Sequence, residues 1–73
     1  MKINNSKDFG KAIAQARKSR NLTQQDLADY TGYSVSYISH LENGKASAEI
    51  DKAIRLANLL ALDINITSRN ETL

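Results

Sequence analysis

Residues 23–45 constrain the fold more than any other stretch, and they read TQQDLADYTGYSVSYISHLENGK. Thr23 and Ser34 are residue types that cap helix N-termini, and each precedes apolar residues at helical spacing. Gly32 lies between the two runs and supplies the freedom that a tight turn needs, and Gly44 follows the second run where helices often end. The apolar positions are Leu27, Ala28, Val35, Ile38 and Leu41. The stretch therefore predicts two short helices joined by a tight turn.

Helical patterns also flank this stretch. We expect helices over about 7–19, 24–30 and 35–43, and a fourth helix that begins at a Ser47 cap. The expected core positions of the first and fourth helices are Phe9, Ala12, Ile13, Ala16, Ile50, Ala53, Ile54, Ala57 and Leu60. The second and third helices then form a helix-turn-helix, the unit that places its second helix in the major groove of DNA.

The pattern changes after the fourth helix. In residues 62–68 the apolar side chains of Leu62, Ile64 and Ile66 alternate with polar ones, which is typical of a strand. A lone strand cannot satisfy its backbone groups, so we expect it to pair with the same strand of a second copy across a two-fold axis. The alternative is a tail whose first apolar residues cover the helical core. The expected fold class is an all-α domain of four to five helices with a C-terminal β-strand that pairs across a dimer.

Length and composition limit the organisation of the chain. With 73 residues it forms one domain, and with no cysteine and one histidine neither disulfides nor a cysteine-based zinc site can stabilise it. Oligomerisation remains as a stabilising device, so we expect a homodimer. We expect an N-terminal arm over 1–6, a helix-turn-helix DNA-binding domain over 7–61, a dimerising strand over 62–68 and a flexible tail over 69–73.

We expect a cytoplasmic protein. The N-terminal segment does not resemble a signal peptide, and no apolar run approaches membrane-spanning length.

The net charge is +2, and basic residues are concentrated near the N-terminus. They are Lys2, Lys7, Lys11, Arg17, Lys18 and Arg20. Such a cluster either meets phosphates or forms a solvated helix face, and charge alone favours the solvated face.

Several short segments, in order and at these spacings, match a known family. The segments are Ala16-Arg17-Lys18, Asn21-Leu22-Thr23-Gln24, Leu27-Ala28, Gly32-Tyr33-Ser34, Ile38-Ser39 and Leu41-Glu42-Asn43-Gly44-Lys45. Through them, residues 9–61 resemble the Xre/Cro–C1 type of helix-turn-helix domain, whose fold is lambda-repressor-like. The alternating segment directly after the fourth helix is most like that of the HipB-type antitoxins.

The resemblance implies a sequence-specific repressor of transcription that binds a palindromic operator in double-stranded DNA as a homodimer. It further implies an antitoxin that autoregulates a toxin–antitoxin operon and binds a HipA-type kinase toxin as its partner. A stand-alone phage-type repressor and a restriction–modification controller are alternatives within this class. A protein-interaction module that does not bind DNA is an alternative from another class. Salt-dependent binding to duplex DNA separates the antitoxin, the stand-alone repressor and the controller protein from the protein-interaction module.

Base contacts are expected from the outward side of the third helix. Its outward positions, with Tyr37 at the edge, are Val35, Ser36, Tyr37, Ser39 and His40. Serine can bond several base edges, valine can pack on a thymine methyl group, and histidine can donate to guanine. Arginine, glutamine and asparagine, the strongest bidentate readers, are missing from these positions. Shape readout and water-mediated contacts are therefore expected to contribute.

Phosphate contacts are expected where helices begin and end. Gln24 opens the second helix, whose positive end favours an anion, and the resemblance assigns this glutamine to the DNA backbone. The full set of expected phosphate contacts is Thr23, Gln24, Ser34, Asn43 and Lys45, with Thr23 mainly a helix cap. The resemblance also pairs Arg17 with Glu42 as a structural ion pair, and the alternative makes Arg17 a phosphate ligand.

Enzymatic chemistry has no support in the sequence. His40 has no cysteine or second histidine to share a metal, and Asp26 and Asp29 lack the companions of a catalytic site. We therefore expect no enzyme activity, no cofactor and no metal. The sequence does not indicate the operator or the surface that any toxin would use.

Overall fold

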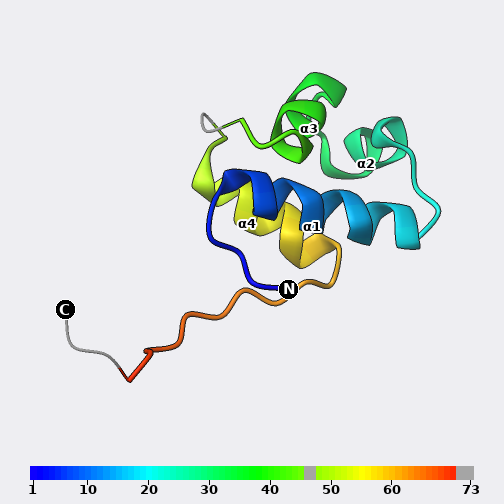
Figure 1. Cartoon of the computed structure of the whole chain (residues 1–73). Coiled ribbons are helices and arrows are strands. Elements are labelled where there is room, and N and C mark those ends of the chain that lie inside the picture. The colour runs from blue at the N-terminus through cyan, green and yellow to red at the C-terminus, as the bar shows by residue number, and fades with distance from the viewer. Residues whose placement is uncertain (46–47, 71–73) are drawn as a thin grey trace.

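The computed structural model describes residues 1–45 and 48–70, and within these ranges it contains four α-helices. Their bounds are Ser6–Ser19 for α1, Gln24–Thr31 for α2, Val35–Glu42 for α3 and Ile50–Leu59 for α4. Figure 1 shows α2 and α3 together on one side of α1, and α3 packs against both α1 and α2. The all-α helix-turn-helix fold expected from the sequence is thereby confirmed.

Side-chain caps explain where the first three helices begin. The Asn5 side chain accepts a hydrogen bond from the backbone N–H of Asp8 at 2.8 Å. Thr23 and Asp26 form a reciprocal capping box, which holds the pKa of the Asp26 carboxyl below its ordinary value. Ser34 Oγ accepts from the backbone N–H of Tyr37 at 3.0 Å. These polar side chains fix the helix starts because they bind N–H groups that have no partner within the helix.

The beginning of α4 differs from this pattern. Ser47, the expected cap, lies outside the described residues. Glu49 occupies the N-cap position of α4 and its side chain makes no capping hydrogen bond.

The core is built from all four helices. Its buried apolar residues are Ile13, Leu27, Ala28, Ile38, Leu41, Ala53, Leu56, Ala57 and Leu60. The prediction was wrong for Ile50 and Ile54, which are 73% and 37% exposed, and it did not include Leu56, which is fully buried. The reason is the rotation of α4 about its axis, which turns positions 53, 56, 57 and 60 inward.

Gly10 allows α1 to approach α3 closely. A Cβ atom at this position would lie 2.6 Å from the carbonyl oxygen of Glu42, and closer still to the carbonyl oxygen of Leu41. Both obstacles are backbone atoms of α3, so they cannot move aside as the end of a side chain can. The close crossing of the two helices therefore requires glycine here.

The C-terminal end of α4 is a Schellman motif with alanine at the left-handed position. Ala61 has φ of 59°, the N–H of Leu62 donates to the carbonyl of Ala57 at 2.9 Å, and the N–H of Ala61 donates to that of Asn58 at 3.0 Å. Left-handed backbone costs an L-residue roughly 1–2 kcal/mol, which glycine avoids.

Replacing Ala61 by glycine should therefore stabilise the fold. After the larger entropy of glycine in the unfolded chain is subtracted, we expect a net gain of about 0.5–1 kcal/mol in the free energy of unfolding. Urea denaturation followed by far-UV circular dichroism measures it. The matched control is Ala14→Gly in the interior of α1, which should lose about 1 kcal/mol. A decrease in the free energy of unfolding for both variants would contradict the role assigned to Ala61.

The predicted strand is absent from residues 62–68 of this chain, which the structure describes as having neither helix nor strand. Leu62 packs against the core, whereas Ile64 and Ile66 are 49% and 98% exposed. The physical reason is that the single chain offers this segment no strand to pair with in its described part. In Figure 1 the segment runs away from the four helices. Leu73, at the end of the tail, lies outside the described residues.

Two further observations concern membranes and metal ions. No helix in the described ranges is long and apolar enough to span a membrane. Among the same residues, no three histidine, aspartate or glutamate side chains gather as a metal ion would require.

Candidate nucleic-acid interface

The turn between α2 and α3 is fixed by Gly32 and Thr31. Gly32 has φ of 80°, and a Cβ atom there would meet nothing within 4 Å, so the backbone conformation rather than space favours glycine. Thr31 is buried, and its Oγ1 donates to the carbonyl of Leu27 at 2.8 Å and accepts from the N–H of Tyr33 at 3.1 Å. Thr31 was not among the residues predicted to be important, although its position just before the turn glycine indicated a role in the turn. These contacts fix the backbone of the turn and so the orientation of α3 relative to α2.

The five residues that were expected to contact bases differ in their exposure. Ser36 and His40 are exposed on the outer side of α3. Val35, Tyr37 and Ser39 are half-buried, and the first two pack against the core. Ser36 and His40 are therefore the pair most open to a ligand in front of α3.

Tyr37 faces α4. Its ring packs edge-on against Tyr33 with the centroids 5.3 Å apart, and Lys52 Nζ lies 5.5 Å from the Tyr37 centroid. The Tyr37 hydroxyl donates to the carbonyl of Glu49 at 3.4 Å. Burial, together with the neighbouring Tyr33 and Glu49, raises the pKa of Tyr37. Tyr37 thus joins α3 to the start of α4.

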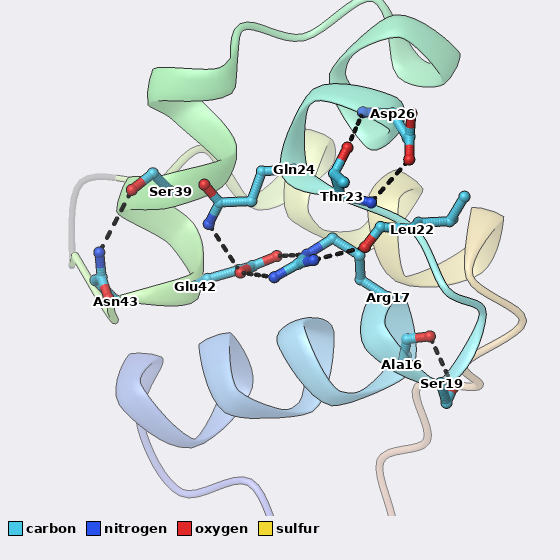
Figure 2. A network of polar contacts seen from close by, with 10 residues as sticks. All are labelled: Ala16, Arg17, Ser19, Leu22, Thr23, Gln24, Asp26, Ser39, Glu42 and Asn43. Atoms are coloured by element: carbon cyan, nitrogen blue, oxygen red, sulfur yellow. Dashed lines mark hydrogen bonds and ion pairs between the residues drawn. The ribbon is translucent and has the colours of Figure 1, made fainter.

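A polar network links α1, α2 and α3 beside this surface, as Figure 2 shows. Arg17 Nε donates to Glu42 Oε2 at 2.7 Å, and Arg17 Nη2 donates to Glu42 Oε1 at 3.0 Å. Arg17 Nη1 donates to the carbonyl of Leu22 at 2.7 Å, and Gln24 Nε2 donates to Glu42 Oε1 at 3.0 Å. One carboxylate therefore receives donors from the end of α1 and the start of α2.

The geometry favours a structural role for Arg17. All three of its guanidinium nitrogens donate within the protein, and its side chain is only 9% exposed. The hydrogen bonds to Glu42 raise the pKa of Arg17 above its ordinary value. Among the alternatives that the sequence left open, the ion pair with Glu42 is the arrangement present.

Gln24 is held by the same carboxylate. One N–H of its amide is bound to Glu42, so the side chain lies fixed at the start of α2. The second N–H of the amide group remains to donate elsewhere. The half-buried Gln24 side chain is compatible with a phosphate contact through that second N–H.

The other expected phosphate contacts lie at helix ends. Thr23 and Ser34 use their hydroxyls as caps. Asn43 is exposed after α3, and its Nδ2 lies 3.5 Å from Ser39 Oγ. Lys45 has an exposed side chain, and its backbone N–H donates to the carbonyl of His40 at 3.0 Å. The start of α2 and the residues just after α3 thus offer polar groups near the C-terminal end of α3, and Ser34 lies at its beginning.

Comparison with known proteins identifies what this architecture is similar to. A sequence model described as helix-turn-helix matches residues 13–66. The chain is 33% identical to an uncharacterized HTH-type transcriptional regulator, y4mF, of Sinorhizobium fredii over 70 residues, which cover 96% of this chain and 92% of that protein. It is 34% identical to the ImmF control region 10 kDa protein of Bacillus phage phi105 over 65 residues, which cover 89% of this chain and 72% of the phage protein.

Solved structures show the same fold. A chain of a HipB-O4 20mer complex superposes with a TM-score of 0.81 at 22% identity, covering 93% of this chain and 96% of that chain. A chain of a HipA-HipB-O2-O3 complex gives the same TM-score, identity and coverage. At this identity the likeness establishes the fold.

Proposed function

The chain belongs to the helix-turn-helix family of DNA-binding transcriptional regulators, and we propose that it is a repressor that binds a palindromic operator as a homodimer. The observation that carries the proposal is the exposed face of α3, where Ser36 and His40 stand clear of the protein interior. Polar groups at the start of α2 and after α3 lie near the C-terminal end of this helix. In such an arrangement the polar groups hold the phosphates and the exposed face meets the base edges.

Salt-dependent DNA binding tests the proposal. Duplexes selected from a random library by the wild-type protein are titrated by fluorescence anisotropy at several salt concentrations. We expect the logarithm of the association constant to fall linearly with the logarithm of salt concentration. Selection that yields no consensus, together with no salt-dependent binding, would leave the protein-interaction module as the better proposal.

Substitutions at Ser36 and His40 should change which operator is preferred. Both side chains are exposed on α3 and are placed to meet base edges, where a good contact discriminates by about 1–3 kcal/mol. In vitro selection with Ser36→Ala and His40→Ala, compared with the wild-type consensus, measures the change. The matched control is Ser68→Ala, a serine exposed in the tail. Recovery of the wild-type consensus from both α3 variants would show that neither side chain reads bases.

The segment after α4 is our proposed dimer contact. Ile64 and Ile66 are exposed in the single chain and alternate with polar residues, as a strand with one apolar face would. We propose that two copies of residues 62–68 pair across a two-fold axis and cover these side chains.

The double variant Ile64→Lys and Ile66→Lys should abolish this dimer. It would place charges on the face that the proposed partner covers, and loss of the second half-site should weaken operator binding by about a hundredfold. Analytical ultracentrifugation and operator titration measure the two effects. The matched control, Asn65→Lys with Thr67→Lys, puts equal charge on the other face and should remain dimeric. A wild-type protein that is monomeric at micromolar concentration would exclude the strand contact.

We further propose that the chain is the antitoxin of a kinase toxin whose operon it represses. The support is the fold shared with chains of HipB complexes, one of which also contains HipA. Co-purification from the native host followed by mass spectrometry tests this. A kinase-like partner is the expected result. DNA binding without such a partner would favour a stand-alone repressor, which the similarity to the phage control-region protein also supports.

A further inference from the structure

The beginning of α1 is joined to the connection between α3 and α4. Ser6 Oγ donates to the carbonyl of Gly44 at 2.9 Å. Gly44 has φ of 79°, and a Cβ atom there would lie 2.7 Å from the Cα of Lys7. The backbones of Gly44 and Lys7 are therefore in direct contact. Figure 1 shows the first turn of α1 beside this connection.

This contact brings basic residues from distant parts of the sequence together. Lys7 lies in the first turn of α1 and Lys45 follows Gly44, so the Gly44 contact places both at one corner of the fold. Both side chains are exposed, and neither makes a hydrogen bond or ion pair within the described part of the chain.

The nearby carboxylates are already bound to the protein. Asp8 accepts the backbone N–H of Asn4 at 3.1 Å, in the direction of the N-terminal arm. Glu42 is neutralised by Arg17. Asp8 keeps its charge, but in the described part of the chain neither lysine side chain at this corner forms an ion pair, so both ammonium groups can bind an anion.

The same geometry distinguishes Lys7 from the other basic residues near the N-terminus. Arg17 is bound to Glu42, and Arg20 Nη2 donates to the carbonyl of Leu60 at 3.1 Å. Lys18 is exposed near the far end of α1, about 16 Å from Lys7 along the helix axis at the usual rise per residue. The basic cluster of the sequence is thus divided by the fold into groups with different environments.

We propose that Lys7 binds DNA backbone phosphate beside the phosphate contacted by Lys45, which makes the first turn of α1 part of the DNA-binding surface. The inference rests on the proposed DNA-binding function and deepens it. Asn43 and Lys45, just after the C-terminal end of α3, are the expected phosphate contacts on this side, and Gly44 between them touches Lys7. The ammonium group of lysine binds phosphate as a point charge and needs no fixed orientation. The Lys7 side chain therefore has only to reach the phosphate next to the one contacted by Lys45.

Salt titration of charge variants tests the proposal. The probe is the duplex selected by the wild-type protein, and the variants are Lys7→Gln, Lys7→Arg and Lys18→Gln. Lys7→Gln should weaken binding about five- to tenfold at 0.1 M salt, and it should lower the salt slope by about one ion per subunit. Lys7→Arg should keep the slope. Lys18→Gln removes the same charge from the same helix and should leave the slope unchanged.

The change in salt slope for each variant decides whether Lys7 contacts a phosphate. A slope that falls only in Lys7→Gln supports the contact. An equal fall in Lys7→Gln and Lys18→Gln would indicate a general effect of net charge and overturn the proposal, as would a Lys7→Gln slope equal to that of the wild type. If the wild-type protein binds no duplex, the proposed function itself fails, and that result is distinct from the others. Circular dichroism of each variant verifies that these exposed substitutions leave the helices intact.

Discussion

Replacing Glu42 by alanine is expected to lower the free energy of unfolding by about 3–5 kcal/mol, because it leaves the buried guanidinium of Arg17 without its counter-charge. The two side chains are 9% and 6% exposed, so water cannot replace the lost carboxylate readily. The loss is comparable to a large part of the stability of a small domain, typically about 5–15 kcal/mol. Urea denaturation followed by far-UV circular dichroism measures it.

Two controls separate the buried pair from a general effect of losing a carboxylate. Glu49→Ala removes an exposed ion pair with Lys52, which spans 3.4 Å, and should cost less than about 1 kcal/mol. The double variant Arg17→Met with Glu42→Leu removes both charges and should recover most of the stability, since an apolar pair can replace a buried ion pair. A Glu42→Ala variant as stable as Glu49→Ala would show that the pair contributes little.

The second large effect is expected at Gly10. Glycine inside a helix is usually less stable than alanine by about 0.5–1 kcal/mol, so an exposed site would gain from Gly→Ala. Here the added Cβ would lie 2.6 Å from the carbonyl oxygen of Glu42, and α3 would have to move away from α1. We therefore expect Gly10→Ala to destabilise the fold by about 3 kcal/mol, measured by urea denaturation.

The same substitution at Gly32 provides the comparison. A Cβ atom at Gly32 meets nothing within 4 Å, so only the left-handed backbone opposes it, at roughly 1–2 kcal/mol. Gly10→Ala should be the more damaging of the two. If it proved neutral or stabilising, the two helices would have to separate more easily than the packing around Gly10 indicates.

The sequence predicted those elements whose cause is local. The helices expected over 7–19, 24–30 and 35–43 were placed to within one residue at each end. Their starts were predictable because the side chains of Asn5, Thr23 and Ser34 bond N–H groups in the first helical turn. The helix-turn-helix fold followed from these caps and from the apolar spacing between them. The network around Glu42 was expected only in part: resemblance paired it with Arg17, but the bond from Gln24 was not foreseen.

The sequence did not predict what depends on distant contacts. The rotation of α4 depends on which of its faces meets the other helices, and the apolar residues of α4 are spread widely enough to allow more than one face. Gly10 carried no local signal, because its role arises from two carbonyl groups some thirty residues away in the chain. The predicted strand over 62–68 needs a pairing partner, and alternation alone cannot supply one within a single chain.

The exposed face of α3 takes no part in the interactions that stabilise the domain. The side chains of Ser36 and His40 make no hydrogen bond or ion pair within the described residues, whereas Glu42 and Ile38 on the same helix are built into the polar network and the core. Substitutions at the two exposed positions therefore leave folding almost untouched. If Ser36 and His40 read bases as we propose, copies of such a chain that arise by gene duplication can acquire different DNA targets through these two positions without losing the fold.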